Sequence, residues 1–492
     1  MKRKRTWIIV CGLLVCLLLC GCRKLQELDR AATTPAPIVV EREEADADEA
    51  KEAGEDGTEP ESGDGNLISD EADGSALDKA APEEADAGPI RTPVQVKGIY
   101  ISAYVAGTTE LLDNVIAGMD RTEANALVID LKDDYGRVVC EMDSPLVTEL
   151  GSVKTYIGDM EGLMRKLDEH DIYAIARIPA FRDAWLGEVR PDWCVQQADG
   201  SVFRDRDGNA WVNPYRREAW DYLLEIATEA KKLGFDEVQF DYVRFCTERG
   251  MQDCVFAEED TQGRSRTDII LEFMEYAYEI LRAQELFVSA DVFGAIINND
   301  QNANNIGQIY GEMAKHLDYI SPMIYPSHYA DGNYGIDHPD LHPYETIRAA
   351  LEDSCRELYA AGLDGSSVAA VRPWLQDFTA SWLASHIPYG ADEVRTQIQA
   401  VYDSGYDEWL LWDASCHYSW DGLLTPEAAV EESAAVAASR EALPETDWAS
   451  EDMPAETSME AEASESGEAE AQTEPSADLS LEGKVETANG EE

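Results

Sequence analysis

The sequence is poor in basic residues. It has 39 Lys and Arg against 99 Asp and Glu, which gives a formal net charge of −60 at pH 7. Proteins bind nucleic acid through basic patches that neutralise phosphate groups. The charge balance therefore excludes DNA and RNA as expected partners.

Familiar catalytic signatures are also missing from the central part of the chain. It contains no HExxH, GxSxG, P-loop or EF-hand pattern, and no cysteine spacing resembles a zinc site. We therefore expect no metal and no cofactor. Six of the ten cysteines lie beyond the N-terminal region, at positions 140, 194, 246, 254, 355 and 416. They could form disulfides, with Cys246 and Cys254 the nearest pair, or stay free thiols.

The N-terminus has the pattern of an export signal. MKRKR is followed by the apolar run TWIIVCGLLVCLLLCG, and the next residue is Cys22. A small residue before a cysteine at this point resembles a bacterial lipobox. We expect residues 1–22 to be a lipoprotein signal peptide with Cys22 lipidated, which predicts a lipid anchor on the extracellular face of the cell membrane. An uncleaved anchor helix is the alternative.

Two acidic segments flank the central part. Residues 23–94 and 439–492 are dominated by Glu, Asp, Ala, Gly and Pro, with few aromatic residues. Such segments cannot bury enough apolar surface to offset chain entropy. We expect both to be disordered and residues 95–438 to form one folded domain, which we expect to be monomeric.

The central part alternates strand and helix patterns. Apolar, β-favouring segments recur eight times, at 97–104, 125–131, 172–178, 236–242, 286–294, 318–325, 367–375 and 407–414. Helix-period segments separate them, near 110–121, 160–169, 214–234, 268–284, 343–361 and 390–404, with a last one near 426–438. Eight such units predict an α/β fold, a (β/α)8 TIM barrel. An open doubly wound sheet is the competitor, but no glycine-rich phosphate turn follows the first strand.

The segments after the strands are long and those before them are short, which places function on the carboxyl face of the barrel. Polar and aromatic residues gather at the predicted strand ends. Besides Asp241 and Asp291, the candidates for substrate binding are Asp130, Lys132, Arg177, Tyr242, Arg244, Tyr325, His328, Arg372, Trp374, Gln376, Trp412 and Asp413. Carboxylates together with aromatic faces are what sugar cleavage needs.

Asp241 and Asp291 end neighbouring strands inside apolar runs, VQFDY and SADVF. Glycosidic cleavage needs two carboxyl groups with separate roles. We expect Asp241 to be the nucleophile or base and Asp291 the general acid, with the roles open to exchange. A structural ion pair between Asp241 and Arg244 is the alternative.

Other residues have simpler explanations. Asp133, Asp134, Asp183 and Asp377 are expected to cap helices or bind loop amides. Trp374 and Trp412 could cap the barrel, and Arg177 and Arg372 could pair with the carboxylates or clamp an anionic group. His328 is a further candidate for general acid.

Several segments together resemble a bacterial family of glycoside-hydrolase-like domains, DUF4015. They include VKGIYISAY, ALVIDLKDDYG, AIARIPAFRD and WVNPY followed by GFDEVQFDYVRF, and the resemblance spans about residues 96–430. It implies a TIM-type barrel, a glycan-hydrolysing activity, and an aspartate at the end of strand four that matches Asp241. Asp291 is the second carboxylate it suggests. Cys246 stands where the family usually has proline, which affects the loop after strand four.

The first hypothesis is a lipid-anchored enzyme, a glycosidase that hydrolyses a cell-wall or extracellular polysaccharide. A non-catalytic carbohydrate-binding lipoprotein is the alternative, and a wall-assembly scaffold that works through its acidic tails is the third. The carboxylate pair favours the first.

Overall fold

The computed structural model describes residues 93–297, 299–363 and 369–442, with side chains up to Val436 in the last helix. The predictions for the signal peptide, Cys22 and most of the two acidic segments fall outside these residues. Within the described part, no helix is both long enough and apolar enough to cross a membrane.

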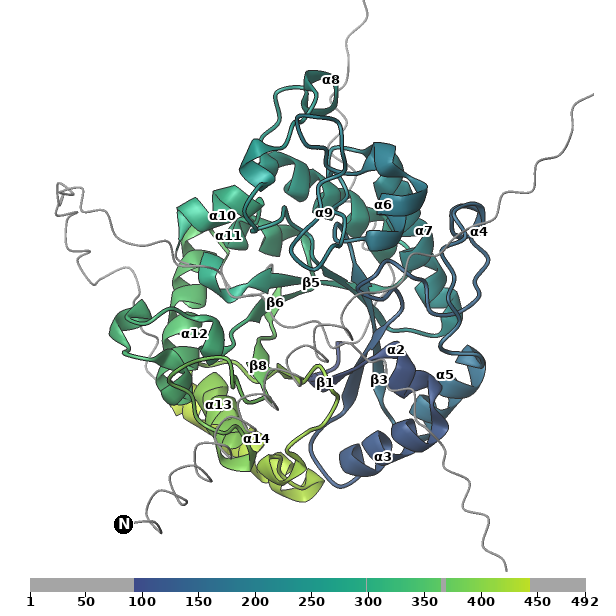
Figure 1. Cartoon of the computed structure of the whole chain (residues 1–492). Coiled ribbons are helices and arrows are strands. Elements are labelled where there is room, and N and C mark those ends of the chain that lie inside the picture. Colours follow the sequence, from purple (N-terminus) through teal and green to yellow (C-terminus); the bar gives the residue numbers. More distant parts are fainter. Residues whose placement is uncertain (1–92, 298, 364–368, 443–492) are drawn as a thin grey trace, which may run out of the picture. The chain divides into compact units, whose positions relative to one another are not determined.

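Parallel strands close into a barrel at the centre of the domain (Figure 1). The strands are β1 (Lys97–Ile101), β2 (Ala126–Asp130), β3 (Tyr173–Pro179), β4 (Glu237–Asp241), β5 (Phe287–Phe293), β6 (Tyr319–Met323), β7 (Ala370–Val371), β8 (Trp374–Gln376) and β9 (Trp409–Trp412). Each pairs with its neighbours, β6 pairs with both β7 and β8, and the β1–β9 pairing closes the ring. Since β7 and β8 are two pieces of one barrel strand, the predicted TIM barrel is confirmed.

Helices surround the barrel (Figure 1). The long ones occupy the predicted segments: α3 (Thr109–Met119), α5 (Met160–Glu169), α7 (Arg217–Leu233), α9 (Arg266–Arg282), α12 (Pro343–Ala360), α13 (Ala391–Asp403) and α14 (Pro426–Ala442). Short helices that the sequence analysis did not predict are α2 (Ala103–Gly107), α4 (Pro145–Glu149), α6 (Ala184–Val189), α8 (Glu258–Thr261), α10 (Asp300–Ile306) and α11 (Tyr310–Met313). Most of them lie within the long segments that follow strands, which carry the expected function.

The sequence encodes these helix boundaries locally. Ser265 and Asp268 form a reciprocal capping box at the start of α9. Gly234 ends α7 in the left-handed conformation, with φ 104°, where a glycine carries no Cβ penalty. The chain then turns directly into β4, which brings Asp241 to the carboxyl face.

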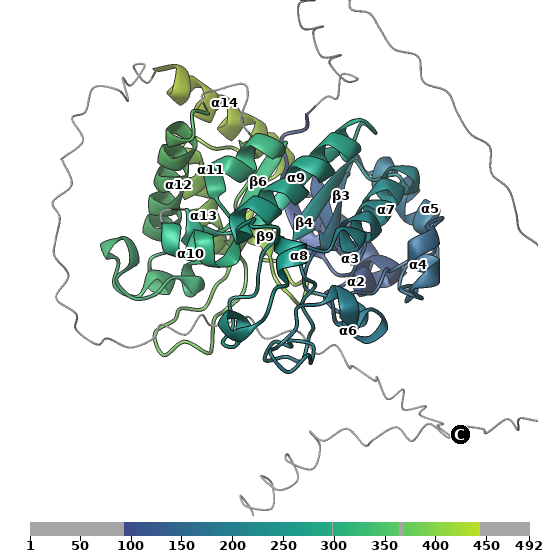
Figure 2. The ribbon, with the colours of Figure 1, turned by 90° about the horizontal axis from the view of Figure 1, so that it is seen from above.

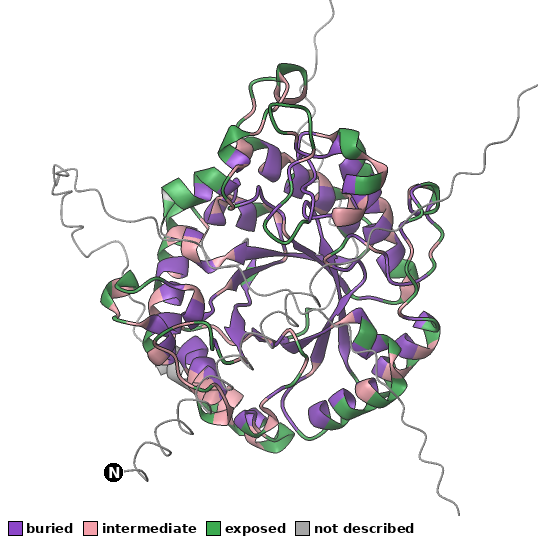
Figure 3. Ribbon diagram, in the orientation of Figure 1, coloured by how far each residue is buried: buried purple, intermediate pink, exposed green. Residues whose placement is uncertain are grey.

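The core has two layers, and the strands are its most buried part (Figure 3). A large apolar cluster lies between the strands and the helices. A smaller cluster fills the barrel interior and includes Val128, Ile175, Trp374 and Leu410. Alternate residues of each strand point inward, so the interior floor supports the side chains at the strand ends.

The loops after β3 and β4 pack on each other over the carboxyl face. Gln196 forms isolated bridges with both Val202 and Val255, and Arg182 bridges Trp211. Figure 2 shows α6 and α8, which belong to these loops, on the same side of the barrel. These packed loops lie beside the end of β4.

Candidate active site

Four predicted residues from four consecutive strands meet at the carboxyl face. Asp130 ends β2, Arg177 lies in β3, Asp241 ends β4 and Asp291 lies in β5. In the β4–β5 ladder Phe240 is level with Ala290, so the next residue on each strand is Asp241 and Asp291. The two predicted catalytic carboxylates therefore come from level positions on neighbouring strands.

Arg177 binds three carboxylates. Its Nη1 donates to Asp130 Oδ1 over 2.7 Å, and its Nη2 donates to Asp134 Oδ1 over 2.9 Å. Nε and Nη2 donate to Asp241 Oδ2 over 3.0 and 2.6 Å. The partner of Asp241 is thus Arg177, and the alternative of an Asp241–Arg244 ion pair is wrong. All the acids that surround Arg177 favour its charged form, and its pKa is raised despite burial.

The backbone after Asp241 is strained in a way that fixes the carboxylate. Tyr242 has φ 49°, an uncommon conformation for a bulky residue. Its backbone N–H donates to Asp241 Oδ1 over 2.6 Å. The amides of Ala180 and Phe181 donate to the carbonyls of residues 241 and 242, so β3 holds the turn in place. Asp241 is therefore oriented from both oxygens.

Asp291 has a different environment. It is 2% exposed and accepts one hydrogen bond, over 2.6 Å, from the indole N–H of Trp374. Burial, and then the nearby charge of Asp241, raise the pKa of Asp291 well above its ordinary value. Both effects favour the protonated form of Asp291, whereas Asp241 faces the Arg177 guanidinium.

Asp130 and Asp134 complete the cluster. Tyr100 donates its hydroxyl to Asp130 Oδ2 over 2.7 Å. Burial, opposed by Arg177, raises the pKa of Asp130 to about 7. The expectation that Asp134 only binds a loop or caps a helix is wrong, because it bonds Arg177. Burial alone would raise the pKa of Asp134, but the charges of Arg177 and Arg182 outweigh burial, and the pKa is lowered.

The other three acids assigned to loops and caps behave as predicted. Asp133 accepts the amides of Tyr135 and Arg137, Asp183 caps α6, and Asp377 binds the amide and hydroxyl of Ser419.

Aromatic residues border the cluster on the side of β9. The Trp412 ring stacks on Tyr100 with centroids 4.3 Å apart, and the Arg177 guanidinium lies 5.6 Å from the Trp412 ring. Trp412 is half-buried, so part of its ring is open to a ligand. Trp374 is buried and contacts Trp412 edge-on.

A second aromatic group follows β6. Tyr325 and His328, which ends a short 3-10 helix (Pro326–His328), contact Phe378, and the Trp382 ring stacks on Phe378. Trp382 is 40% exposed and escaped the sequence analysis. Burial lowers the pKa of His328 to about 4, so it is neutral at pH 7 and is unsuited to be the general acid.

Four predicted binding residues are engaged elsewhere. Lys132 is 0% exposed and binds Asp183 and the carbonyl of Pro179. Arg372 is also fully buried and pairs with Glu237, the first residue of β4, and with Glu408, just before β9. These partners belong to the amino ends of the strands, so Arg372 does not reach the carboxyl face.

Gln376 and Asp413 are structural as well. The fully buried Gln376 side chain bonds Ser327, Asp340 and the carbonyl of Phe378. Asp413 accepts the amides of Ser415 and His417 and organises the turn after β9. Internal partners thus occupy both ends of the Gln376 amide and one oxygen of Asp413, and their role in binding substrate stays a prediction.

Arg244 remains close to the cluster without joining it. It is 6% exposed, and its Nη1 donates to the carbonyl of Phe245 over 3.0 Å. The rings of Trp211, Tyr242 and Phe293 surround the guanidinium. Its neighbour Cys246, which stands where the family usually has proline, is buried against Trp211 and Met251.

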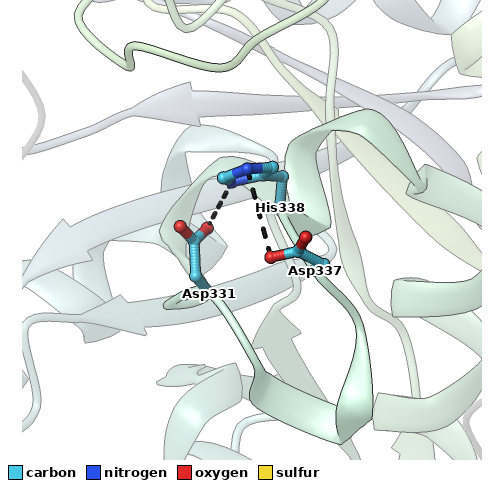
Figure 4. A group of neighbouring side chains, drawn as sticks. All are labelled: Asp331, Asp337 and His338. Carbon is cyan, nitrogen blue, oxygen red and sulfur yellow. Dashed lines mark hydrogen bonds and ion pairs between the residues drawn. The ribbon is translucent and has the colours of Figure 1, made fainter.

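Two other features lie away from this cluster. Asp331, Asp337 and His338 bring three possible metal ligands together on the loop after β6 (Figure 4), with both carboxylates exposed and paired to the imidazole. A polar pocket of about 480 Å³ lies between α7, α8 and α9 and contains none of the predicted site residues. All six described cysteines are free thiols.

Comparisons with solved structures found several partly similar chains. A hypothetical protein from Ruminiclostridium thermocellum is 36% identical, over 39% of this chain and 97% of that chain, with a TM-score of 0.37. The PgaB (BpsB) glycoside hydrolase domain from Bordetella bronchiseptica is 12% identical, over 72% of this chain and 98% of that chain, with a TM-score of 0.46. The α-galactosidase TtGalA from Thermus thermophilus is 14% identical, over 71% of this chain and 66% of that chain, with a TM-score of 0.42. No curated protein matches the chain.

The profile of one protein family covers most of the barrel. It matches residues 98–418, from β1 to the turn after β9, and is described as a "Putative glycosyl hydrolase domain". This is more than half of the chain, and it includes every residue of the carboxylate cluster. The chain therefore belongs to the DUF4015 family.

Proposed function

We propose that this protein is a glycoside hydrolase that cleaves a cell-wall or extracellular polysaccharide, with Asp241 as nucleophile or base and Asp291 as general acid. One observation carries the proposal. Two carboxyl groups stand level on neighbouring strands in different surroundings: Arg177 binds Asp241, whereas burial raises the pKa of Asp291. This division is what glycosidic cleavage requires of its two carboxyl groups.

Asp241 is the carboxyl group that a guanidinium binds. Arg177 donates two hydrogen bonds to its Oδ2, and the Tyr242 amide donates one to its Oδ1. Charged donors stabilise a carboxylate and hold its orientation. Asp241 is thereby oriented to attack the anomeric carbon or to activate a water.

Asp291 is the proton donor in this proposal. Its burial raises its pKa and favours the protonated form, which can donate a proton to the leaving oxygen. Asp134, which the same arginine binds and whose pKa Arg177 and Arg182 lower against burial, adds to the negative field of the cluster. That field stabilises the oxocarbenium-like charge that develops on the sugar.

Half-buried Trp412 and exposed Trp382 provide faces on which sugar rings can stack. Tyr325, His328 and Tyr242 lie near these faces or next to Asp241 and can contribute to binding. This arrangement supports a polymer that lies across the carboxyl face.

The test is a turnover screen of the purified full-length chain on polysaccharides, with release of reducing ends as the readout. Asp241→Asn and Asp291→Asn are expected to lower the rate at least 10³-fold while the fold is kept. Asp113→Asn, at a half-exposed carboxylate on α3, is the matched control and is expected to retain the rate. Glycan binding by the wild type without any turnover would favour the non-catalytic lipoprotein instead.

The location on the cell is part of the proposal. The sequence pattern at residues 1–22 supports export and lipidation of Cys22, which would tether the enzyme to the membrane. Metabolic labelling with a fatty acid tests this. Label is expected in the wild type and absent from Cys22→Ala, and equal labelling of both would contradict the anchor.

A further inference from the structure

Three buried arginines lie at the ends of β3 and β4 or in the loops that follow, and the protein neutralises two of them. Arg177 binds Asp130, Asp134 and Asp241. Arg182 binds Asp205 and Asp207. Arg244 makes no ion pair with any residue that the structure describes, although it is 6% exposed.

Aromatic rings surround the unpaired guanidinium. Its carbon lies 4.3 Å from the centre of the Phe293 ring, 4.9 Å from Trp211 and 5.3 Å from Tyr242. These faces attract a cation, but they do not accept hydrogen bonds in the plane of the guanidinium. The backbone carbonyl of Phe245 accepts from Nη1, which leaves Nε and Nη2 without an acceptor among the described residues.

The position of this group relates it to the proposed catalytic pair. Tyr242 directly follows Asp241, and Phe293 lies two residues beyond Asp291 on the same face of β5. The guanidinium contacts both rings. Arg244 therefore lies beside the ends of β4 and β5, next to the place where the scissile bond would lie.

Burial of a cation without a counter-charge is unfavourable. Burial lowers the pKa of Arg244, and the nearby groups Cys246, Tyr242 and Asp241, none of which forms an ion pair with it, only partly oppose this effect. An arginine nevertheless stays protonated at neutral pH, and its planar fork matches a carboxylate with two parallel hydrogen bonds. The site thus lacks an anion that a ligand can supply.

We propose that Arg244 binds a carboxylate on the sugar residue next to the scissile bond, so that the substrate is an acidic glycan. This inference rests on the proposed function, because it assigns a substrate class to the same site. A carboxylate can belong to a uronic acid or to the lactyl group of muramic acid. Both present the same acceptor to the guanidinium.

The test measures binding rather than turnover, by titration calorimetry on the full-length chain with Asp241→Asn to prevent cleavage. The probes are oligogalacturonate, oligoglucuronate, oligomannuronate and a muramic-acid-containing oligosaccharide, each beside its carboxyl-reduced counterpart. At least one acidic probe is expected to bind roughly 10- to 100-fold more tightly than its reduced form, as for a hydrogen-bonded charge pair. The probe that shows this preference identifies the source of the carboxylate.

Adding Arg244→Gln is expected to abolish the preference and leave the affinity for the reduced form unchanged. Arg244→Lys keeps the charge but loses the planar fork, and it is expected to retain only part of the preference for the acidic probe. This second variant still tests the inference if the glutamine variant does not fold. Arg217→Gln removes an arginine stacked on Trp220 and Tyr276 on the exposed side of α7, and is expected to change nothing.

The inference is overturned if no acidic probe binds better than its reduced form, or if the preference survives Arg244→Gln. Its failure differs from failure of the proposed function. An Arg244-dependent preference without any turnover by the wild type would contradict only the hydrolase. Turnover of a neutral glycan without any carboxylate preference would contradict only the acidic substrate.

Discussion

Trp374 donates its indole N–H to Oδ1 of Asp291, so a side chain of β8 holds the carboxyl group of a residue in β5. The hydrogen bond stabilises the ionised form and lowers the pKa of Asp291, against burial, which raises it. Without the donor, the pKa of Asp291 rises further.

Trp374→Phe is therefore expected to shift the alkaline limb of the kcat–pH profile to higher pH, because the general acid keeps its proton longer. A hydrogen bond to a charged group is worth about 1.5–3 kcal/mol, which corresponds to roughly 1–2 pH units. Trp185→Phe is the control, because it also removes an indole N–H donor, but one that bonds the carbonyl of Leu150 instead of Asp291. An unmoved limb in Trp374→Phe would show that Asp291 is not the group that titrates there.

Asp130 predicts a pH-dependent stability. Its pKa is about 7 in the folded protein and about 3.9 in the unfolded chain. Between these values the folded state holds a proton that the unfolded state has lost, so this contribution to stability is complete below pH 4 and disappears as pH rises through 7. In the wild type the free energy of unfolding is expected to fall between pH 5 and 7. In Asp130→Asn this fall is expected to be smaller, by up to about 1.4 kcal/mol per pH unit.

Urea titrations at several pH values measure this slope. Glu161→Gln, at an exposed position on α5, is the control and should follow the wild type. Identical slopes for wild type and Asp130→Asn would mean that Asp130 is ionised throughout this range.

The strained backbone at Tyr242 predicts that a glycine variant is more stable than an alanine variant, the opposite of the usual order. Both Tyr242→Gly and Tyr242→Ala lose the ring, but only alanine must hold φ 49° against its Cβ. The glycine variant is expected to be more stable than the alanine variant by about 1–2 kcal/mol. At Tyr104, in helix α2, the same pair should show the usual order, with alanine the more stable. Chemical denaturation measures all four variants, and a more stable Tyr242→Ala would show that residue 242 relaxes in solution.

The level positions of Asp241 and Asp291 predict the stereochemistry of cleavage. Neighbouring strands are about 4.8 Å apart. This is close to the separation of about 5–5.5 Å found for carboxyl groups in retaining glycosidases and below the roughly 6.5–9.5 Å of inverting ones. Proton NMR of the first product formed from a cleaved oligosaccharide is expected to show the anomer of the substrate. The opposite anomer would place a water between the two groups.

The barrel was predictable because its signals are local and repeated. Apolar runs of strand length alternate with helix-period segments, and the same pattern placed Asp241 and Asp291 at strand ends. Gly234 and Ser265 mark boundaries that lie next to them in the sequence. Each of these signals can be read within a few residues.

The contacts within the site could not be predicted in this way. Arg244 lies three residues from Asp241, but Arg177, 64 residues away, binds it because β3 and β4 are neighbours. Lys132 and Arg372 lie beside strands, as predicted. Their burial inside the barrel could not be predicted, because it depends on how the strands are staggered when the barrel closes. Asp134 looked like a loop residue because nothing nearby in the sequence reveals Arg177.

One hydrogen bond on Asp241 comes from the main chain rather than from a side chain. The amide of residue 242 is present whatever amino acid occupies that position, with proline as the exception. Evolution can therefore exchange the side chain at 242, and with it the ring beside the substrate, without releasing the carboxylate from this donor. The ring at position 242 and the orientation of the Asp241 carboxylate can thus vary independently of each other.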